Sequence, residues 1–223
     1  PGYGFLSENQ DFVEICKLHN IKFIGPSSEV MEKMADKSKA KEEMVRAGVP
    51  VVPGSKGAVR TLDEGKKIAR EIGYPIMAKA SAGGGGRGMR LIKEEKDFDS
   101  QYLAASSEAL AAFGDGTMYL ERFINNPRHI EVQVIGDSHG NAIHIGERDC
   151  SLQRRHQKVI EESPAILLND ETRAKLHEVA VKATKYLKYE GAGTVEFLAD
   201  DKQNIYFMEM NTRLQVEHPV SEM

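Results

Sequence analysis

A strand-like run that leads into a polar loop carries the densest group of candidate catalytic residues. It reads FMEMNTRLQVEH at residues 207–218. Side chains alternate faces along a strand, so we expect Glu209 and Asn211 on one side. A carboxylate and an amide oxygen suit a hard cation such as Mg²⁺, which keeps waters and phosphate oxygens as its other ligands. Arg213 and Glu217 then offer a bidentate anion clamp and a base, although a solvated surface strand would carry the same residues.

A second carboxylate comes from the preceding predicted strand. Residues 193–199 and 205–211 flank a turn and predict an antiparallel hairpin, which would place Glu196 near Glu209 and Asn211. Two carboxylates and an amide suit a Mg²⁺ ion that bridges ATP phosphates. Without a cation, the two acids would repel each other if they were buried.

A run of glycines, SAGGGGRG at residues 81–88, lies between two predicted strands. Its spacing fits the dinucleotide fingerprint, but that fingerprint needs a helix directly after it, and here a strand is predicted. Gly88 is followed by Met89, so the run is no Walker P-loop either. A strand–glycine turn–strand unit is typical of a flap over nucleotide phosphates, with Lys79 as a point charge. The alternative is a flexible surface hairpin.

Two further polar features are weaker signals. The run ERDCSLQRRHQKV at residues 147–159 is predicted to interrupt the strand that begins at Ala142, as a solvated loop. Its Gln153, His156 and Lys158 would also suit ribose and anion contacts. Glu121, at the end of a predicted strand, could face adenine or ribose at a hinge.

The elements that must position these residues predict an α/β (α+β) chain. Residues 1–48 alternate helices with a short strand at 21–24, with Ser7 as the first helix cap, as in the end of a doubly wound domain. The stiff segment VPVVPG at 49–54 is a plausible linker. We expect a lid domain over residues 49–124 and a partial domain with antiparallel strands over 125–223.

The composition is that of an ordinary globular protein, with 223 residues of which 40% are hydrophobic and 29% charged. A net charge of -4 gives no reason to expect nucleic acid or an anionic membrane as partner, and no apolar run is long enough to span a bilayer. Cys16 and Cys150 have no zinc spacing, which favours a reducing, cytoplasmic location. The chain opens in mid-motif at Pro1 and stops after a polar loop, so we expect a fragment that lacks both ends.

Together the motifs resemble biotin carboxylase, of the ATP-grasp superfamily, over almost the whole chain. The wording MNTR is more similar to the acetyl-CoA carboxylase component than to pyruvate carboxylase. The matching stretches are PGYGFLSEN (1–9), FIGP (23–26), MADKSKAK (34–41), GVPVVPG (48–54), KASAGGGGRGMR (79–90), NPRHIEVQV (126–134), ERDCSLQRRHQKV (147–159), GAGTVEF (191–197) and EMNTRLQVEHPV (209–220).

This resemblance implies an ATP-grasp fold with a glycine-flap lid, and it implies roles for individual residues. Bicarbonate would attack the γ-phosphate of ATP to give carboxyphosphate, whose carboxyl group passes to biotin. The implied catalytic residues are Arg213, Glu217 as the base, and Lys158; the bicarbonate pocket is Lys158, Arg213, Gln215 and Val216; the ligands of Mg²⁺ or Mn²⁺ are Glu196, Glu209 and Asn211. The implied ATP-binding residues are Lys37, Lys79, Gly85, Gly86, Glu121, Arg122, Phe123, Ile124, His129, Gln153, His156, Glu196 and Glu209.

The implied partners are a biotin carboxyl carrier protein or domain, a carboxyltransferase component, and a second copy in a homodimer of the full-length protein. The family also uses an arginine beyond this chain to stabilise the biotin enolate, so we expect the fragment to be inactive alone. Two alternatives remain, an ATP-grasp ligase of the carbamoyl-phosphate synthetase type and a catalytically silent nucleotide-binding scaffold. The motifs RRHQK and NTRLQVEHPV argue against the first, and the intact Lys79, Lys158, Glu209, Arg213 and Glu217 against the second.

Overall fold

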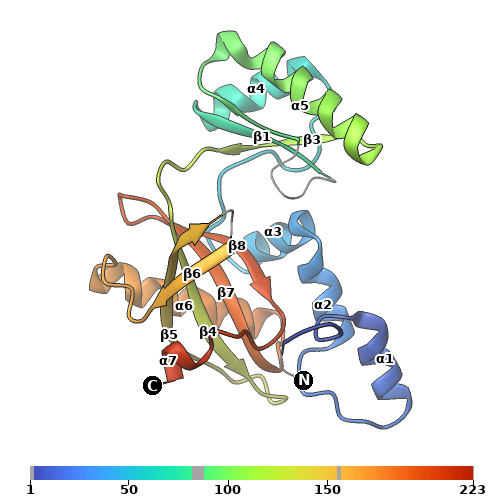
Figure 1. The fold of residues 1–223 in the computed structure, drawn as a ribbon, viewed down its shortest axis with the longest axis vertical. Coiled ribbons are helices and arrows are strands. Elements are labelled where there is room, and N and C mark those ends of the chain that lie inside the picture. Colours follow the sequence, from blue (N-terminus) through green and yellow to red (C-terminus); the bar gives the residue numbers. More distant parts are fainter. Residues whose placement is uncertain (1–2, 82–87, 155–156, 223) are drawn as a thin grey trace. The chain divides into compact units, whose positions relative to one another are not determined.

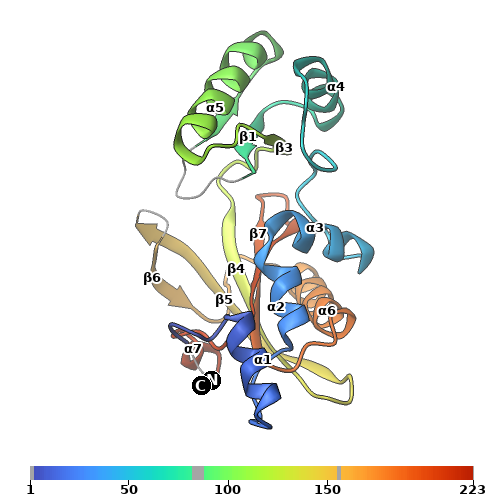
Figure 2. The ribbon, with the colours of Figure 1, turned by 90° about the vertical axis from the view of Figure 1, so that its right-hand side faces the viewer.

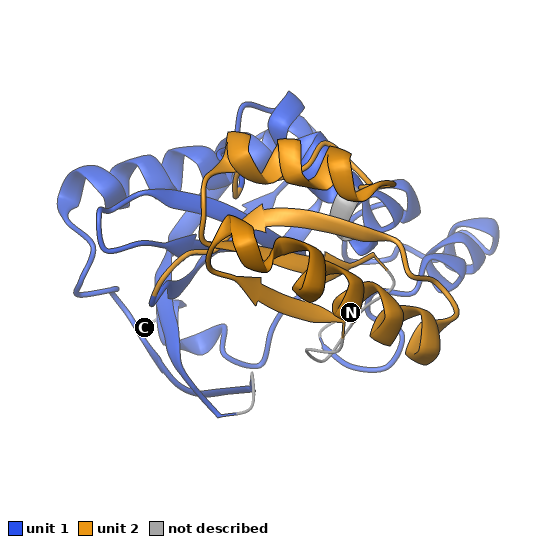
Figure 3. Cartoon of the chain, turned by 90° about the horizontal axis from the view of Figure 1, so that it is seen from above, with its two compact units in different colours: residues 1–51, 126–223 blue, residues 52–125 orange. Residues whose placement is uncertain are grey.

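The structure is a computed structural model that describes residues 3–81, 88–154 and 157–222, without the side chains of residues 37 and 38. Residues 1–51 and 126–223 form one compact unit, and residues 52–125 form a second (Figure 3). The domain limits predicted at residues 48 and 124 stay a prediction. Among the described residues, no helix has both the length and the apolar character needed to cross a bilayer.

The second unit is a small antiparallel sheet, ordered β2-β1-β3, with helices packed on it (Figure 1). The predicted strand pair around the glycine run is confirmed, because β1 and β2 pair antiparallel from Ile76↔Ile92 to Lys79↔Met89. The buried Phe98 and Leu120 belong to the apolar cluster that joins helices and sheet. The elements are α4 (Leu62–Ile72), β1 (Ile76–Ala80), β2 (Met89–Ile92), the 3₁₀ helix η1 (Glu95–Asp97), α5 (Phe98–Phe113) and β3 (Met118–Arg122).

The first unit is built on a five-stranded antiparallel sheet with the order β6-β5-β4-β7-β8. Strands β7 and β8 form the hairpin that the sequence predicts. The strands are β4 (Arg128–Gly136), β5 (Ala142–Arg154), β6 (Gln157–Glu162), β7 (Gly191–Ala199) and β8 (Ile205–Asn211); the helices are α1 (Gln10–Leu18), α2 (Ser28–Ala35), α3 (Lys37–Arg46), α6 (Asp170–Tyr186) and α7 (Pro219–Glu222).

The two faces of this sheet have opposite chemistry. On one face, Val132 and Val195 are cross-strand partners and join an apolar core that includes Leu176 and Ala180 of α6 (Figure 2). Side chains alternate along a strand, so the next register pair, Glu131 and Glu196, lies on the other face. This face is buried as well, since Glu131 is 0% and Glu196 3% exposed. The core face holds the fold together, and the polar face is available for chemistry.

Three local predictions are wrong. The polar run at 147–159 does not break the sheet, because β5 continues to Arg154 and β6 begins at Gln157. Its charged side chains can be buried because partners on other elements satisfy them. Residues 21–24 form no strand, and Ile24 is 73% exposed. The cap of α1 is Asn9 rather than Ser7, since the Asn9 side chain accepts a hydrogen bond of 2.8 Å from the Phe12 amide.

Glu147 shows how β5 is tied to α6. Its carboxylate accepts hydrogen bonds from Arg173 Nε at 2.9 Å, His177 Nε2 at 2.6 Å and the Ala165 amide at 3.1 Å. Burial alone would raise the pKa of this carboxyl, but these donors outweigh burial and hold the pKa at about 2. The charged form is therefore the one that the folded state stabilises.

The Glu147 cluster predicts a loss of stability in acid. A carboxyl whose pKa is lower in the folded than in the unfolded state stabilises the fold above its unfolded pKa, near 4.5, and loses that contribution as the pH falls toward 2. We expect Glu147→Gln to be destabilised at pH 7 by on the order of 3 kcal/mol. Its stability should also fall less than that of the unchanged protein between pH 5 and pH 3. Urea unfolding across this pH range measures both effects, and parallel pH curves for the two proteins would contradict the assignment.

Candidate functional site

The polar face of the sheet places two carboxylates directly opposite each other. Glu131 on β4 and Glu196 on β7 are register partners, and like charges in this position destabilise a sheet. Lys158, on β6, resolves the conflict because its Nζ binds Glu131 and also lies 3.1 Å from Glu196 Oε1. A third carboxylate joins at the same atom, with Glu217 Oε1 2.9 Å from Lys158 Nζ. One ammonium group therefore binds three acids from three parts of the chain.

These contacts set the charge state of the group. Burial would lower the pKa of Lys158, but Glu196 and Glu131 outweigh it and raise that pKa, so the ammonium stays charged at neutral pH. Burial would likewise raise the pKa of Glu217, and the hydrogen bond from Lys158 turns the shift downward. Glu217 is therefore a carboxylate at neutral pH and can accept a proton.

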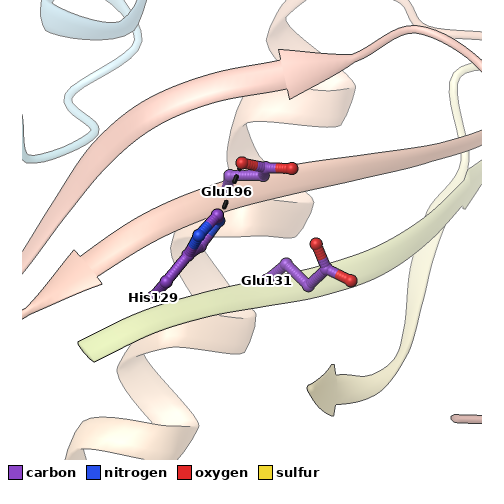
Figure 4. Close-up of side chains that lie close together, drawn as sticks. All are labelled: His129, Glu131 and Glu196. Atoms are coloured by element: carbon purple, nitrogen blue, oxygen red, sulfur yellow. Dashed lines mark hydrogen bonds and ion pairs between the residues drawn. The ribbon is translucent and has the colours of Figure 1, made fainter. Parts of the chain in front are cut away.

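His129 completes the surroundings of Glu196, as Figure 4 shows. Gln153 Nε2 lies 2.7 Å from His129 Nδ1, and because the amide nitrogen can only donate, Nδ1 accepts. Nε2 then carries the proton that it donates to Glu196 Oε2 at 2.8 Å. Although burial opposes it, the contacts with His129 and Lys158 hold the pKa of Glu196 at about 2.

The loop after β8 brings an arginine to the same unit. Arg213 Nε donates to Glu8 Oε2 at 3.1 Å, and its other nitrogens donate to Leu214 O at 3.1 Å and Asn211 Oδ1 at 3.4 Å. Arg213 and Val216 line an open pocket of about 520 Å³ together with residues of the N-terminal segment, among them Tyr3 and Glu8. Within this pocket, a small anion could meet the guanidinium of Arg213.

The residues fit a divalent cation beside Glu196. Its cross-strand partner on β8 is Glu209, and Asn211 Nδ2 donates to Glu196 Oε1 at 2.7 Å. Carboxylate and amide oxygens are the ligands that Mg²⁺ prefers, although Asn211 must rotate its amide to offer the oxygen. The charge balance agrees, because within the described residues the three carboxylates Glu131, Glu196 and Glu217 pair with two permanent cations, Lys158 and Arg148.

A second grouping of possible ligand atoms, His129, Glu131 and Glu196, fits Mg²⁺ less well. One atom from each lies within 4.8 Å of the others (Figure 4). Glu131, however, is already bound by Lys158 and by Arg148 Nε at 2.6 Å. Imidazole is also a poor ligand for Mg²⁺, which takes oxygen.

The second unit holds a further group of the predicted ATP residues. Lys79 on β1 and Glu121 on β3 form an ion pair of 2.5 Å across the strands. The residues after Glu121 are fixed by the backbone, since Arg122 donates a side-chain hydrogen bond of 3.0 Å to Ile72 O and the Phe123 amide one of 3.0 Å to Pro75 O. Ile124 is buried at 9% exposure.

The structure thus brings most of the predicted residues of the first unit into one network. Gly85, Gly86 and His156 lie outside the described residues, as does the side chain of Lys37. The sequence analysis missed Glu131, Arg148 and Glu8. The signal for Glu131 was available, because it is an acid on the polar side of a strand whose other side is apolar. Arg148 is its register partner on β5 and was missed because the polar run was predicted to leave the sheet, whereas Glu8 has partners too distant in sequence to be foreseen.

Comparisons with known proteins agree with this arrangement. Residues 36–223 match the family model "Carbamoyl-phosphate synthase L chain, ATP binding domain", and residues 1–31 match "Biotin carboxylase, N-terminal domain". The biotin carboxylase of Nostoc sp. is 58% identical over 223 residues, which are 100% of this chain and 50% of that protein. The chain thus spans about half the length of the curated relatives it matches.

Solved structures give the same result. A crystal structure of a biotin carboxylase–βγ-ATP complex from Campylobacter jejuni superposes with a TM-score of 0.87 at 70% identity, covering 100% of this chain and 50% of that one. The biotin carboxylase domain dimer of Hydrogenobacter thermophilus 2-oxoglutarate carboxylase, in complex with MgADP, ADP and bicarbonate, gives a TM-score of 0.84 at 56% identity, covering 100% and 49%. The chain belongs to the biotin carboxylase family, with the ATP-grasp fold.

Proposed function

We propose that the full-length protein carboxylates biotin, using ATP and bicarbonate, through carboxyphosphate. The observation that carries this proposal is the cluster around Lys158, in which a charged ammonium lies against an ionised Glu217 and the buried Glu196. A phosphoryl transfer to bicarbonate needs a cation for the anion, a base for its proton, and carboxylates for a metal. The bicarbonate and MgADP named for the Hydrogenobacter relative support the same reading for this chain.

We propose ATP-binding residues in each of the two units. In the second unit Lys79 would supply a positive charge to the phosphates, with the glycine run as a flap and residues 121–124 as the adenine hinge. In the first unit, Glu196, Glu209 and Asn211 would hold Mg²⁺ or Mn²⁺. The bound ion would neutralise phosphate charge. His129, Gln153 and His156 would contact ribose and phosphates, and Lys37 would add a further phosphate contact.

Bicarbonate would bind between Lys158 and the loop after β8. Arg213 and Gln215 would donate hydrogen bonds to the anion. Val216 and Arg213 both line the open pocket beside the N-terminal segment. Glu217 takes the proton of bicarbonate, an oxygen of the resulting dianion attacks the γ-phosphorus, and ADP leaves with the electron pair of the broken P–O bond. Carboxyphosphate then breaks down to CO₂ and inorganic phosphate, and a ureido nitrogen of biotin, which gives up its proton to that phosphate, attacks the CO₂ carbon.

The surroundings of the reaction follow from the family. Biotin would arrive on a carrier protein or domain, a carboxyltransferase would use the product, and the full-length protein would act as a homodimer, as the Hydrogenobacter domain does. Cys16 and Cys150 are both buried and free, which supports a reducing, cytoplasmic setting. A role in acetyl-CoA carboxylase, and hence in fatty acid biosynthesis, is the reading that we favour for the parent complex.

The role of Glu217 is tested by Glu217→Gln in the full-length protein. An amide cannot take the proton of bicarbonate, so bicarbonate-dependent ATP hydrolysis should fall by roughly 10²–10⁴-fold while ATP affinity stays within a few fold. Glu222→Gln is the matched control and should keep full activity, since this carboxylate, five residues later, is paired with His218 in the described part of the chain. An unchanged rate in Glu217→Gln would reject this residue as the base, and ATP hydrolysis driven by ammonia instead of biotin would indicate a carbamoyl-phosphate-type ligase.

The metal assignment predicts a change in Mg²⁺ dependence. In the double variant Glu209→Ala/Asn211→Ala the cation keeps only Glu196, so Mg²⁺ should no longer strengthen ATP binding, as measured by calorimetry with and without the ion. Asp201→Asn, in the exposed turn that follows β7, removes a carboxylate from the same hairpin without touching the site. The ligand set would be wrong if the double variant and this control bound MgATP equally well.

A further inference from the structure

Arg148 is a fully buried arginine that none of the proposed roles uses. It lies on β5, its exposure is 0%, and it is the largest fully buried side chain of the described residues. Its Nε donates to Glu131 Oε1 at 2.6 Å, and its other nitrogens donate to four neutral oxygens. These are Gln133 Oε1 at 3.0 Å, Ser221 Oγ at 2.6 Å, Thr194 Oγ1 at 3.5 Å and Gln215 Oε1 at 3.1 Å.

A buried ion pair is a costly way to stabilise a fold. Desolvation of a guanidinium and a carboxylate cancels much of their attraction, and well-packed apolar side chains are often as stable. Arg148 therefore contributes something other than net stability, and its partners show where. Glu131 binds Lys158 of the proposed bicarbonate site, and Gln215 belongs to that site and lies beside Glu196.

The first consequence concerns the Gln215 amide. Arg148 has only donors, so it must meet the oxygen of the amide, and the Gln215 Nε2 group then faces Glu196 Oε1 at 3.4 Å. With the amide reversed, its oxygen would lie against a carboxylate and its NH₂ against a guanidinium. Arg148 thus keeps the N–H donors of Gln215 on the side where the proposed anion binds, and an anion needs such donors.

The second consequence concerns Lys158. Glu131 has one oxygen on Arg148 and the other on Lys158. The hydrogen bond from Arg148 Nε holds one oxygen of this carboxylate in place, and the other oxygen holds the Lys158 ammonium. The same guanidinium therefore determines the position of two donors to the anion.

We propose that Arg148 is a positioning residue for bicarbonate, which acts through Gln215 and Glu131 without touching the anion itself. This inference rests on the proposed function. A loss of the proposed function would appear in the unchanged full-length protein as ATP hydrolysis that does not depend on bicarbonate. A failure of the inference would appear only in the variants below.

The chain offers a matched control in Arg173. Like Arg148, Arg173 binds a buried glutamate. Its partner is Glu147 of β5, which precedes Arg148 in sequence and faces α6 instead of the polar network. Arg148→Lys and Arg173→Lys both keep the charge and remove the fork. Both should lower the melting temperature. Only Arg148→Lys should raise the KM for bicarbonate, by about tenfold, with the KM for ATP unchanged within about twofold.

A double-mutant cycle with Gln215→Leu tests the route of the effect in the same assay. Because part of its effect passes through Gln215, Arg148→Lys should raise the KM by a smaller factor in the Gln215→Leu background than in the unchanged protein. Fully additive increases, or an unchanged bicarbonate KM in a folded Arg148→Lys protein, would overturn the proposal. So would an equal KM increase in Arg173→Lys, because it would show a general loosening of the fold.

A further variant decides the matter if Arg148→Lys does not fold. Gln215→Glu keeps an acceptor for Arg148 but removes the N–H donors. Its bicarbonate KM should rise at least tenfold, and its melting temperature should fall because the new carboxylate faces Glu196. A bicarbonate KM equal to that of the unchanged protein would show that the amide orientation set by Arg148 is irrelevant to binding, and the proposal would be rejected.

Discussion

Two acids that face each other across a pair of strands, Glu131 and Glu196, are the constraint on which the first unit depends. Both are buried, so neither can be neutralised by water, and each requires a cation from elsewhere. Lys158 and Arg148 supply the charges, from β6 and β5. Strands β5 and β6 therefore supply the positive charges that the acids on β4 and β7 require. The ammonium that binds both acids remains 18% exposed, so it is accessible to the anion that we propose there.

The two faces of the sheet divide stability from function. Apolar pairs such as Val132 and Val195 pack against α6 on one face, where burial of area contributes most of the stabilisation. The polar face gains less, since its ion pairs lose in desolvation much of what they gain in attraction. What this face provides is fixed geometry. Arg148, Glu131 and Lys158 hold one another in rigid positions on strands, which is the support that a binding site requires.

Sequence reasoning was reliable where the signal is local. The hairpin of β7 and β8, its placement of Glu196 beside Glu209, and the strands around the glycine run follow from alternation and turn residues, and all were confirmed. It failed where burial depends on distant partners. Residues 147–159 look like a solvated loop because they are charged, yet partners on β4, β7 and α6 allow β5 to carry Glu147 and Arg148 into the interior. No spacing within the run reveals those partners, and the roles of the site residues remain proposals.

The contacts of Arg213 link the candidate cation site to the candidate anion site. Its guanidinium is fixed by Glu8, and one nitrogen also donates to Asn211 Oδ1 at 3.4 Å. Asn211 Nδ2 meanwhile donates to Glu196. When Asn211 turns its oxygen toward a cation beside Glu196, its NH₂ group moves toward Arg213, where one donor cannot bind another. That nitrogen of Arg213 is then left without its acceptor, and an incoming anion can satisfy it. In the site that we propose, a cation at Glu196 would therefore free this nitrogen of Arg213 for bicarbonate.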